Sequence, residues 1–224
     1  CACLLVLVGA FLGVDSPLTV TQMLWVNLIM DTFAAMALSS LPADPKVFDE
    51  KPRDPESHII DRSMMKRIFF GGISFFALLI ALWEILLHAD VTSVRDLFSF
   101  SLIKNALAGD MGAASAEMTP YEMGIFFTTF VMLQFWNIFN ARNYRTENSF
   151  FQTLFSKGSF SWGFYMIVLV ILGGQYLIVN HLGRFFDVAP LSAGDWWRIA
   201  AVTSFVLILP EIVRIIRSLL KNNS

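Results

Sequence analysis

The segment from Phe160 to Val179 runs for 20 residues without a charged side chain. About 20 predominantly apolar residues are needed for a helix to cross the hydrocarbon core of a bilayer. A second run, Ile68–His88, is interrupted only by Glu84 near one end. Because lipid cannot hydrogen-bond exposed backbone groups, such segments cross as helices and not as an open sheet. The chain is therefore predicted to be an all-α integral membrane protein in a lipid bilayer.

Three further segments are long enough to cross, and a fourth is apolar but short. The three are Trp196–Ile216, Val20–Leu41 and Tyr121–Asn140, and the short one is Cys1–Val14. A short amphipathic helix is expected around Val94 to Leu107 in the connection between two spans. The prediction is a polytopic helical bundle of five full transmembrane helices plus the end of a sixth, cut from something larger.

The composition excludes two function classes. Of the 224 residues 56% are hydrophobic and only 15% are charged, whereas a soluble domain has about 25% charged residues. A formal net charge of −2 provides no basic surface for nucleic acid. The two cysteines are too few for a disulfide framework. An aqueous single-core enzyme and a nucleic-acid-binding protein are both set aside.

Basic residues are unevenly divided between the two sides of the expected membrane. Of the 16, four (Arg95, Lys104, Arg184 and Arg198) fall on one side. The other side holds Lys46, Lys51, Arg53, Arg62, Lys66, Arg67, Arg142, Arg145, Lys157, Arg214, Arg217 and Lys221. Because cytoplasmic loops carry the excess of Lys and Arg, the second side and the C-terminus are predicted to be cytoplasmic.

The segment Val20–Leu41 carries polar side chains at the depth of the hydrocarbon core. Asp31 lies about midway along it, and Asn27 precedes Asp31 by four residues, which places both on one helical face. Carboxylate and amide oxygens suit calcium, magnesium or manganese, and sodium is also compatible. The alternative to ion binding is a structural role, in which Asp31 is protonated or hydrogen-bonded and packs against a neighbouring helix. An ionisable group at this depth is a functional candidate by default, so Asn27 and Asp31 are the leading metal ligands.

Other polar and small residues in the spans give weaker signals. Gln134 and Asn137 are three residues apart. They are expected either to face the same cavity as Asn27 and Asp31 or to form interhelical hydrogen bonds. Three glutamates, Glu84, Glu122 and Glu211, lie near span ends and are expected to be hydrated. Two glycine pairs, Gly71-Gly72 and Gly173-Gly174, are expected to allow close helix packing.

The stretch DSPLTVTQMLWVNLIMDTFAAMALSSLPADPKVFDEKPRDP (15–55) resembles the sixth transmembrane helix of P-type calcium-transporting ATPases and the loop that follows it. The resemblance is to the plasma-membrane-type branch and its bacterial relatives. TTFVMLQFWNIFNAR (128–142) is similar to the eighth helix of the same pumps. The resemblance implies four parts: the end of the fifth helix (1–14), the turn and sixth helix (15–41), a cytoplasmic coupling loop (42–62) and a supporting bundle of the seventh to tenth helices (63–224).

The same resemblance implies a calcium site. In these pumps the sixth-helix Asn and Asp, which correspond to Asn27 and Asp31, bind calcium together with groups of the fourth helix. Three ligand positions of the two-calcium branch fall on Ala2, Met30 and Gln134, which are missing or weakened ligands. A single calcium per cycle is therefore expected, with Gln134 as a weak additional candidate.

Further expectations concern the parts that this sequence lacks. ATP and magnesium act in cytoplasmic domains, and the fourth helix and phosphorylation domain are the partners of this region. The 224 residues alone are expected to be inactive, since they contain no nucleotide or phosphorylation motif. The absence of a calmodulin-type tail favours a bacterial inner membrane. Two alternatives stay open: an independent helical transporter or channel subunit with Asp31 as a proton or sodium relay, and a pump for manganese or another cation.

Overall fold

A computed structural model describes residues 2–12, 16–41, 60–89, 91–109, 115, 117–143, 161–208, 210 and 212. Throughout these ranges every regular element is a helix, which confirms the predicted all-α class. In chain order the elements are α1 (Ala2–Leu12), α2 (Val20–Leu24), the π-helix η1 (Trp25–Met30), α3 (Asp31–Ser39), α4 (Arg62–His88), the 3-10 helix η3 (Asp96–Phe98), α5 (Phe100–Ala108), α6 (Pro120–Arg142), α8 (Trp162–His181), α9 (Gly183–Phe186) and α10 (Ala193–Thr203).

Four helical stretches in the described ranges are long and apolar enough to cross a membrane. They are Val20–Ser39, Met64–His88, Pro120–Arg142 and Trp162–His181, and a shorter apolar helix covers Ala2–Phe11. These agree with four of the five predicted full spans and with the partial one. The fifth, Trp196–Ile216, is helical in α10 and again over 205–208, while most of its remainder lies outside the described residues. The predicted coupling loop 42–62 also lies outside them, apart from its last three residues.

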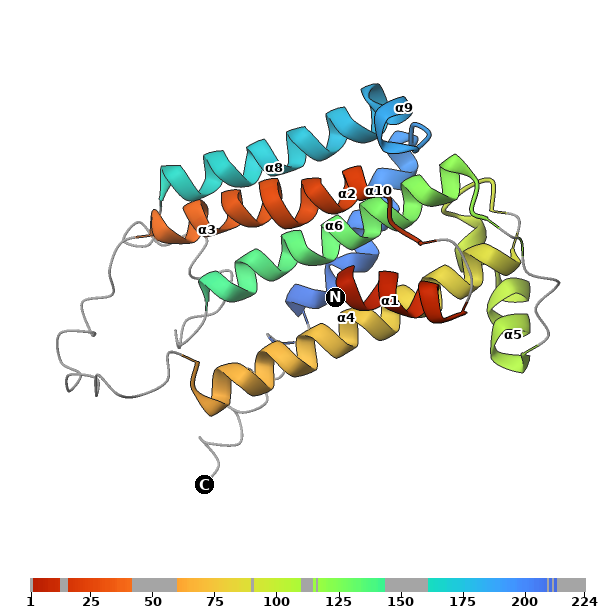
Figure 1. Cartoon of the computed structure of the whole chain (residues 1–224), viewed down its shortest axis with the longest axis horizontal. Coiled ribbons are helices and arrows are strands. Elements are labelled where there is room, and N and C mark those ends of the chain that lie inside the picture. The colour runs from red at the N-terminus through yellow and green to blue at the C-terminus, as the bar shows by residue number, and fades with distance from the viewer. Residues whose placement is uncertain are drawn as a thin grey trace.

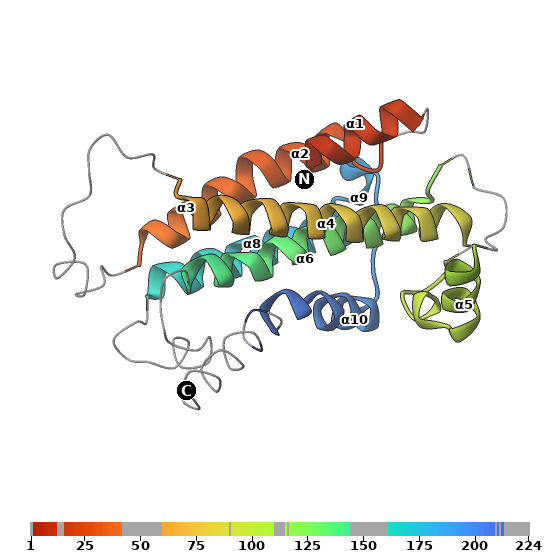
Figure 2. The same cartoon turned by 90° about the horizontal axis from the view of Figure 1, so that it is seen from below.

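Helix α6 lies at the centre of the bundle. It contacts α3, α4, α8 and α10, and the long helices run roughly side by side (Figures 1 and 2). A helix with neighbours on several sides is buried over most of its surface, and most residues of α6 are buried. Its Phe126, Phe127 and Phe130 are at most 1% exposed. The predicted span Tyr121–Asn140, which contains the polar residues Glu122 and Gln134, is thus the central helix of the bundle.

The start of α6 explains why Glu122 is not hydrated as expected. Thr119 caps the helix, and the Glu122 carboxylate accepts hydrogen bonds of 2.8 Å from both the backbone N–H and the hydroxyl of Thr119. The same carboxylate accepts a 3.4 Å bond from the N–H of Val91. Glu122 is only 4% exposed, so the expectation of a hydrated side chain is wrong. The capping box with Thr119 holds the Glu122 carboxylate against the helix start, where it is buried.

The two glycine pairs behave differently. A methyl group added at Gly174 of α8 would lie within 3.0 Å of two ring carbons of Trp25 in η1. The close packing expected at this position is confirmed, and it lies in the contact that joins the α2–η1–α3 stretch to α8 (Figure 1). Gly71, Gly72 and Gly173 have no described atom within 4 Å of such a methyl group. The expectation is therefore wrong for these three within the described part of the chain.

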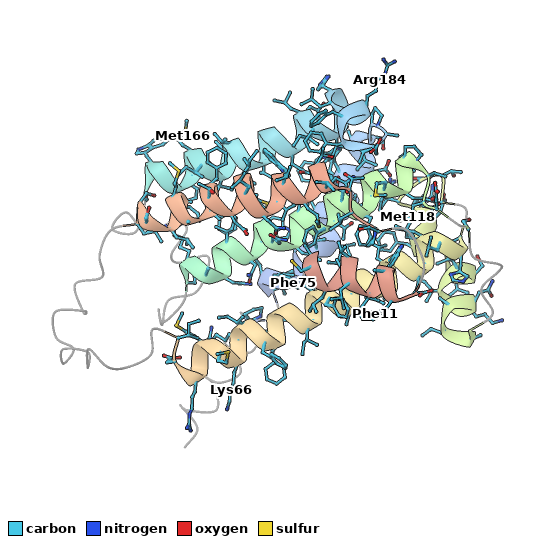
Figure 3. All side chains as sticks on the ribbon, viewed as in Figure 1. Phe11, Lys66, Phe75, Met118, Met166 and Arg184 are labelled. Carbon is cyan, nitrogen blue, oxygen red and sulfur yellow. The ribbon has the colours of Figure 1, made fainter. Side chains whose placement is uncertain are left out.

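Basic side chains separate toward the two ends of the bundle. Lys66, in the first turns of α4, and Arg184, in α9, lie at opposite ends (Figure 3). Arg142 closes α6 at the Lys66 end, where its guanidinium donates a 2.7 Å hydrogen bond to the Tyr165 hydroxyl. This division agrees with the uneven charge distribution of the sequence. It does not itself say which end is cytoplasmic.

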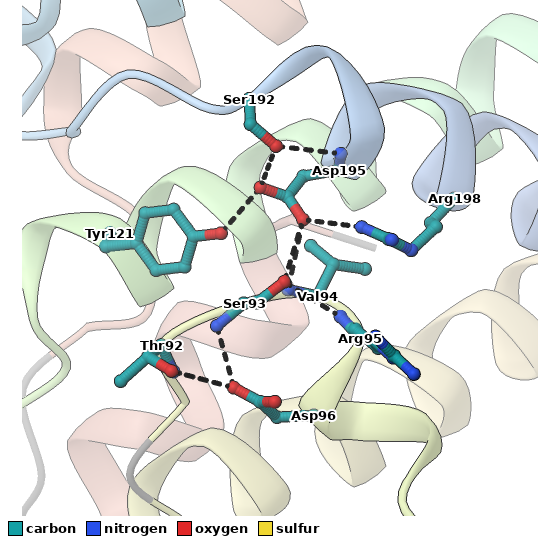
Figure 4. A network of polar contacts seen from close by, with 9 residues as sticks. All are labelled: Thr92, Ser93, Val94, Arg95, Asp96, Tyr121, Ser192, Asp195 and Arg198. Atoms are coloured by element: carbon teal, nitrogen blue, oxygen red, sulfur yellow. Dashed lines mark hydrogen bonds and ion pairs between the residues drawn. The ribbon is translucent and has the colours of Figure 1, made fainter.

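A polar network ties three segments together at the Arg184 end (Figure 4). Its centre is Asp195 in the first turn of α10, which is 3% exposed. The carboxylate accepts bonds from the Ser192 hydroxyl (2.6 Å), the Tyr121 hydroxyl (2.8 Å) and the Val94 N–H (3.2 Å). Arg198 adds an ion pair of 3.3 Å. The network joins the start of α10 to the start of α6 and to the 91–96 segment.

Acidification is expected to weaken this network through Asp195. Burial alone raises the pKa of this carboxyl, but its hydrogen bonds outweigh burial and hold the pKa below the ordinary value of 3.8. A lowered folded-state pKa stabilises the fold at higher pH, and this stability is lost as the pH falls through the folded value. The unmodified protein should thus melt well above Asp195→Asn at neutral pH, and the gap in Tm should close below about pH 4.

Thermal denaturation in detergent across this pH range measures the effect. Asp187→Asn is the matched control, because Asp187 is exposed and has a left-handed backbone (φ 53°) that Asn also adopts. A Tm difference between wild type and Asp195→Asn that is constant with pH would contradict the assignment.

Candidate ion-binding site

The helix that carries Asn27 and Asp31 begins at a capping box. Thr19 accepts a hydrogen bond from the Gln22 N–H at 3.4 Å, and the Gln22 side chain accepts one from the Thr19 N–H at 3.2 Å. Gln22 is fully buried, and its side-chain amide donates a 2.7 Å bond to the Phe186 carbonyl of α9. The start of the helix is thereby fixed to the α8–α9 corner of the bundle.

The middle of this helix departs from α-helical geometry. Trp25–Met30 forms a π-helix, and the N–H of Asp31 donates to the carbonyl of Val26, five residues back. A regular α-helix would have paired the Asp31 N–H with the Asn27 carbonyl. Short π-segments inside α-helices are rare and occur frequently at functional sites. Sequence reasoning expected a regular helix here and missed this feature.

The two faces of the π-helical region differ sharply in burial. Trp25, Val26 and Met30 are at most 9% exposed and belong to the hydrophobic core. Asn27 and Asp31 are exposed. The structure therefore places the two predicted ligands on the face that is turned away from the described remainder of the bundle.

Within the described part of the chain, both ligand candidates are free of hydrogen bonds and ion pairs to other side chains. Within the described ranges no hydrogen bond or ion pair involves the side chain of Asn27 or of Asp31. No cluster of three or more His, Cys, Asp or Glu side chains occurs there either. Calcium prefers six to eight oxygen ligands, so the amide and carboxylate oxygens of these two residues are only part of a cage. The remaining ligands would have to come from groups outside the described residues.

Gln134, the weaker candidate, lies in α6 and is half-buried. Helix α3 contacts α6, but in the described structure no hydrogen bond joins Gln134 to Asn27 or Asp31. Asn137, its neighbour one turn on, is exposed. Asn140 of the same helix donates a 2.8 Å bond to the Val206 carbonyl, which ties α6 to the segment after α10. Gln134 therefore stays a prediction.

Two positions that correspond to ligands of a second ion are both turned into the protein. Met30 is 1% exposed and Ala2 is 5% exposed, and each belongs to the hydrophobic core. The Met30 thioether is thus buried in the core, whereas the Asn27 and Asp31 side chains are exposed.

Comparisons with known proteins agree with this architecture. The family model described as "Cation transporting ATPase, C-terminus" matches residues 15–216. Plasma membrane calcium-transporting ATPase 3 of Homo sapiens is 36% identical over 190 residues, which is 84% of this chain and 14% of that protein. Plasma membrane calcium-transporting ATPase 1 of Gallus gallus is 35% identical over 193 residues, again 84% of this chain and 14% of the relative.

The chain thus spans about one seventh of the length of these relatives. The family match, by contrast, covers nearly all of the chain, including the π-helical segment, the core helix α6 and the polar network at Asp195. The chain belongs to the family of cation-transporting P-type ATPases, as a C-terminal membrane region.

Proposed function

We propose that the chain is the C-terminal membrane region of an ATP-driven pump that exports calcium from the cytoplasm. The relatives are plasma membrane calcium-transporting ATPases, and 84% of this chain aligns with each of the two described. ATP and magnesium would act in domains that this sequence does not contain, together with the fourth helix and the phosphorylation domain. The 224 residues alone would then bind no nucleotide and hydrolyse no ATP.

The observation that carries the proposal is the open face of the π-helical segment. Asn27 and Asp31 are exposed there in a helix that is apolar enough to span a membrane. A carboxylate that faces lipid costs several kcal/mol, on the order of 2.5 to 3.5 even on insertion scales. The Asn27 and Asp31 side chains should therefore face further helices of the pump and a cation held between them.

A single calcium site is the stoichiometry we propose. Met30 and Ala2 are buried in the apolar core and offer no hard oxygen to an ion on the open face. Gln134 is a neutral amide where the two-calcium branch has a carboxylate. Calcium sites depend on the number of charged oxygen ligands, so a second site would be too weakly charged to fill.

Two alternatives would use the same residues. A proton or sodium relay through Asp31 requires no calcium, and family membership favours the pump over an independent transporter. Manganese accepts similar oxygen ligands, so a manganese pump differs from the proposal only in its cargo. A bacterial inner membrane stays a prediction, since the two relatives described are animal proteins, and so does the cytoplasmic C-terminus.

Replacing Asn27 by Ala tests the proposal in the full-length protein. Loss of one oxygen ligand should lower the apparent calcium affinity about 10- to 100-fold, the loss seen even for groups that only support a ligand. The effect is measured by the calcium dependence of phosphoenzyme formation. Binding of radioactive calcium gives the stoichiometry, which we expect to be one ion per phosphorylatable site in the unmodified protein.

The matched control is Asn105→Ala, because Asn105 is an exposed asparagine on α5, outside the spanning helices. Unchanged calcium affinity in Asn27→Ala would remove this residue from the site. If the unmodified protein does not transport calcium, and Asn27→Ala lowers its affinity for manganese, manganese is the cargo.

A further inference from the structure

Helix α5 differs from the long helices in direction. It runs crosswise to them in Figure 1 and is seen nearly end-on in Figure 2. It follows the end of α4 at His88 and precedes the start of α6 at Pro120, both of which are ends of candidate spans. Since span ends mark the surface of the bilayer, α5 lies at the level of that surface, with its axis along it.

The segment before α5 fixes this placement. Val91 and Val94 are at most 3% exposed and belong to the core. The Asp96 carboxylate accepts bonds from the N–H groups of Thr92 (3.1 Å) and Ser93 (2.8 Å). A short amphipathic helix was expected around Val94 to Leu107, and α5 covers the second part of this range, because Ser99 has an extended backbone and caps α5 at its start. The break at Ser99 lets α5 turn across the bundle.

The surface of α5 is divided into an apolar stripe and a polar face. The apolar stripe is Phe100, Ile103 and Leu107, at helical spacings i, i+3 and i+7, with exposed fractions of 82%, 43% and 86%. Ser101 and Asn105 lie on the other side and are also exposed. Three large apolar side chains that remained in water would be a costly surface for so short a helix.

We propose that α5 is an interfacial anchor, which inserts the apolar stripe into the lipid monolayer at the Arg184 end of the bundle. A helix with one apolar and one polar face lies in the interface plane, with the apolar face about 5–10 Å into the headgroup boundary. The exposed Lys104 borders the apolar stripe, and its ammonium group is able to reach lipid phosphates while its stem lies along the acyl surface. The proposal does not depend on which ion the pump carries.

Site-directed spin labelling of the full-length protein tests this anchor. Single cysteines replace Phe100, Ile103 or Leu107 on the apolar stripe and Ser101 or Asn105 on the polar face, in a background in which every native cysteine, including Cys1 and Cys3, is changed to Ser. The protein is reconstituted in vesicles of phosphatidylcholine and phosphatidylglycerol. Labels on the apolar stripe should be at least about threefold more accessible to oxygen than to a water-soluble nickel chelate, because oxygen partitions into the acyl region. Labels on the polar face should show the reverse.

Two results would overturn the proposal. Equal access of the nickel chelate to all five labels would place α5 in water. Labels on the apolar stripe that neither oxygen nor the chelate reaches would show that protein, and not lipid, covers it. Because each label reports its own surroundings, loss of calcium transport in the same samples would not mimic either result.

Discussion

Asparagine in place of Asp31 should abolish calcium transport at calcium concentrations that saturate the unmodified pump. Asp31 is the charged member of the proposed ligand pair, and its side chain is exposed. Replacing the carboxylate by an amide of the same shape removes one negative charge from the cage. We expect the apparent calcium affinity to fall more than about 100-fold, beyond the range found for groups that only orient ligands. Calcium-dependent phosphoenzyme formation and vesicle uptake measure it.

Asp187→Asn is the matched control for this experiment. It makes the same chemical change at an exposed residue at the end of α9, which is the opposite end of the bundle from Lys66. If Asp31→Asn keeps the calcium affinity of the wild type, the carboxylate is not a ligand. If it keeps calcium-dependent phosphorylation but loses coupled proton movement, Asp31 is a relay and the alternative function is favoured.

The course of the chain through the membrane was predictable, because it depends on a local property. Apolar runs of about 20 residues specify a spanning helix regardless of what surrounds them. The helices around Phe160–Val179 and Ile68–His88 accordingly shift by a few residues at their ends, to Trp162–His181 and Arg62–His88. Depth within the bundle was not predictable in this way. Tyr121–Asn140 gave a weaker hydropathy signal and yet became the core helix α6.

Polar residues were predictable in position but not in environment. Glu122 looked hydrated because it is near a span end, whereas its carboxylate is buried by bonds to Thr119 and to Val91, 31 residues away. The bond to Val91 depends on how the segment after α4 folds back, which no local pattern encodes. Asn27 and Asp31 were recognised as candidates from polarity alone. Their exposure and the π-helical turn beside them, in which Trp25 and Met30 pack into the core, were not predictable from polarity.

The contact between Trp25 and Gly174 leads to the second large expected effect. Gly174→Ala should destabilise the protein by about 1–3 kcal/mol, the usual cost of overpacking a well-packed core. The added methyl group would overlap two ring carbons of Trp25, a rigid side chain that is only 9% exposed. Gly173→Ala is the control on the adjacent residue, where a methyl group meets no described atom within 4 Å. Thermal denaturation in detergent should separate the two variants clearly.

A double-mutant cycle decides whether the overlap itself causes the loss. Trp25→Phe removes the outer ring carbons, so it should be less costly in the Gly174→Ala background than in the wild type, with a coupling of about 0.5–3 kcal/mol. Strictly additive effects would contradict the steric explanation. Because Trp25 precedes Asn27 by two residues in η1, Gly174→Ala should also displace the open face and weaken calcium binding. The double variant should recover part of that affinity, since Gly174 and Trp25 belong to the contact through which α8 packs against the helix that carries the ligands.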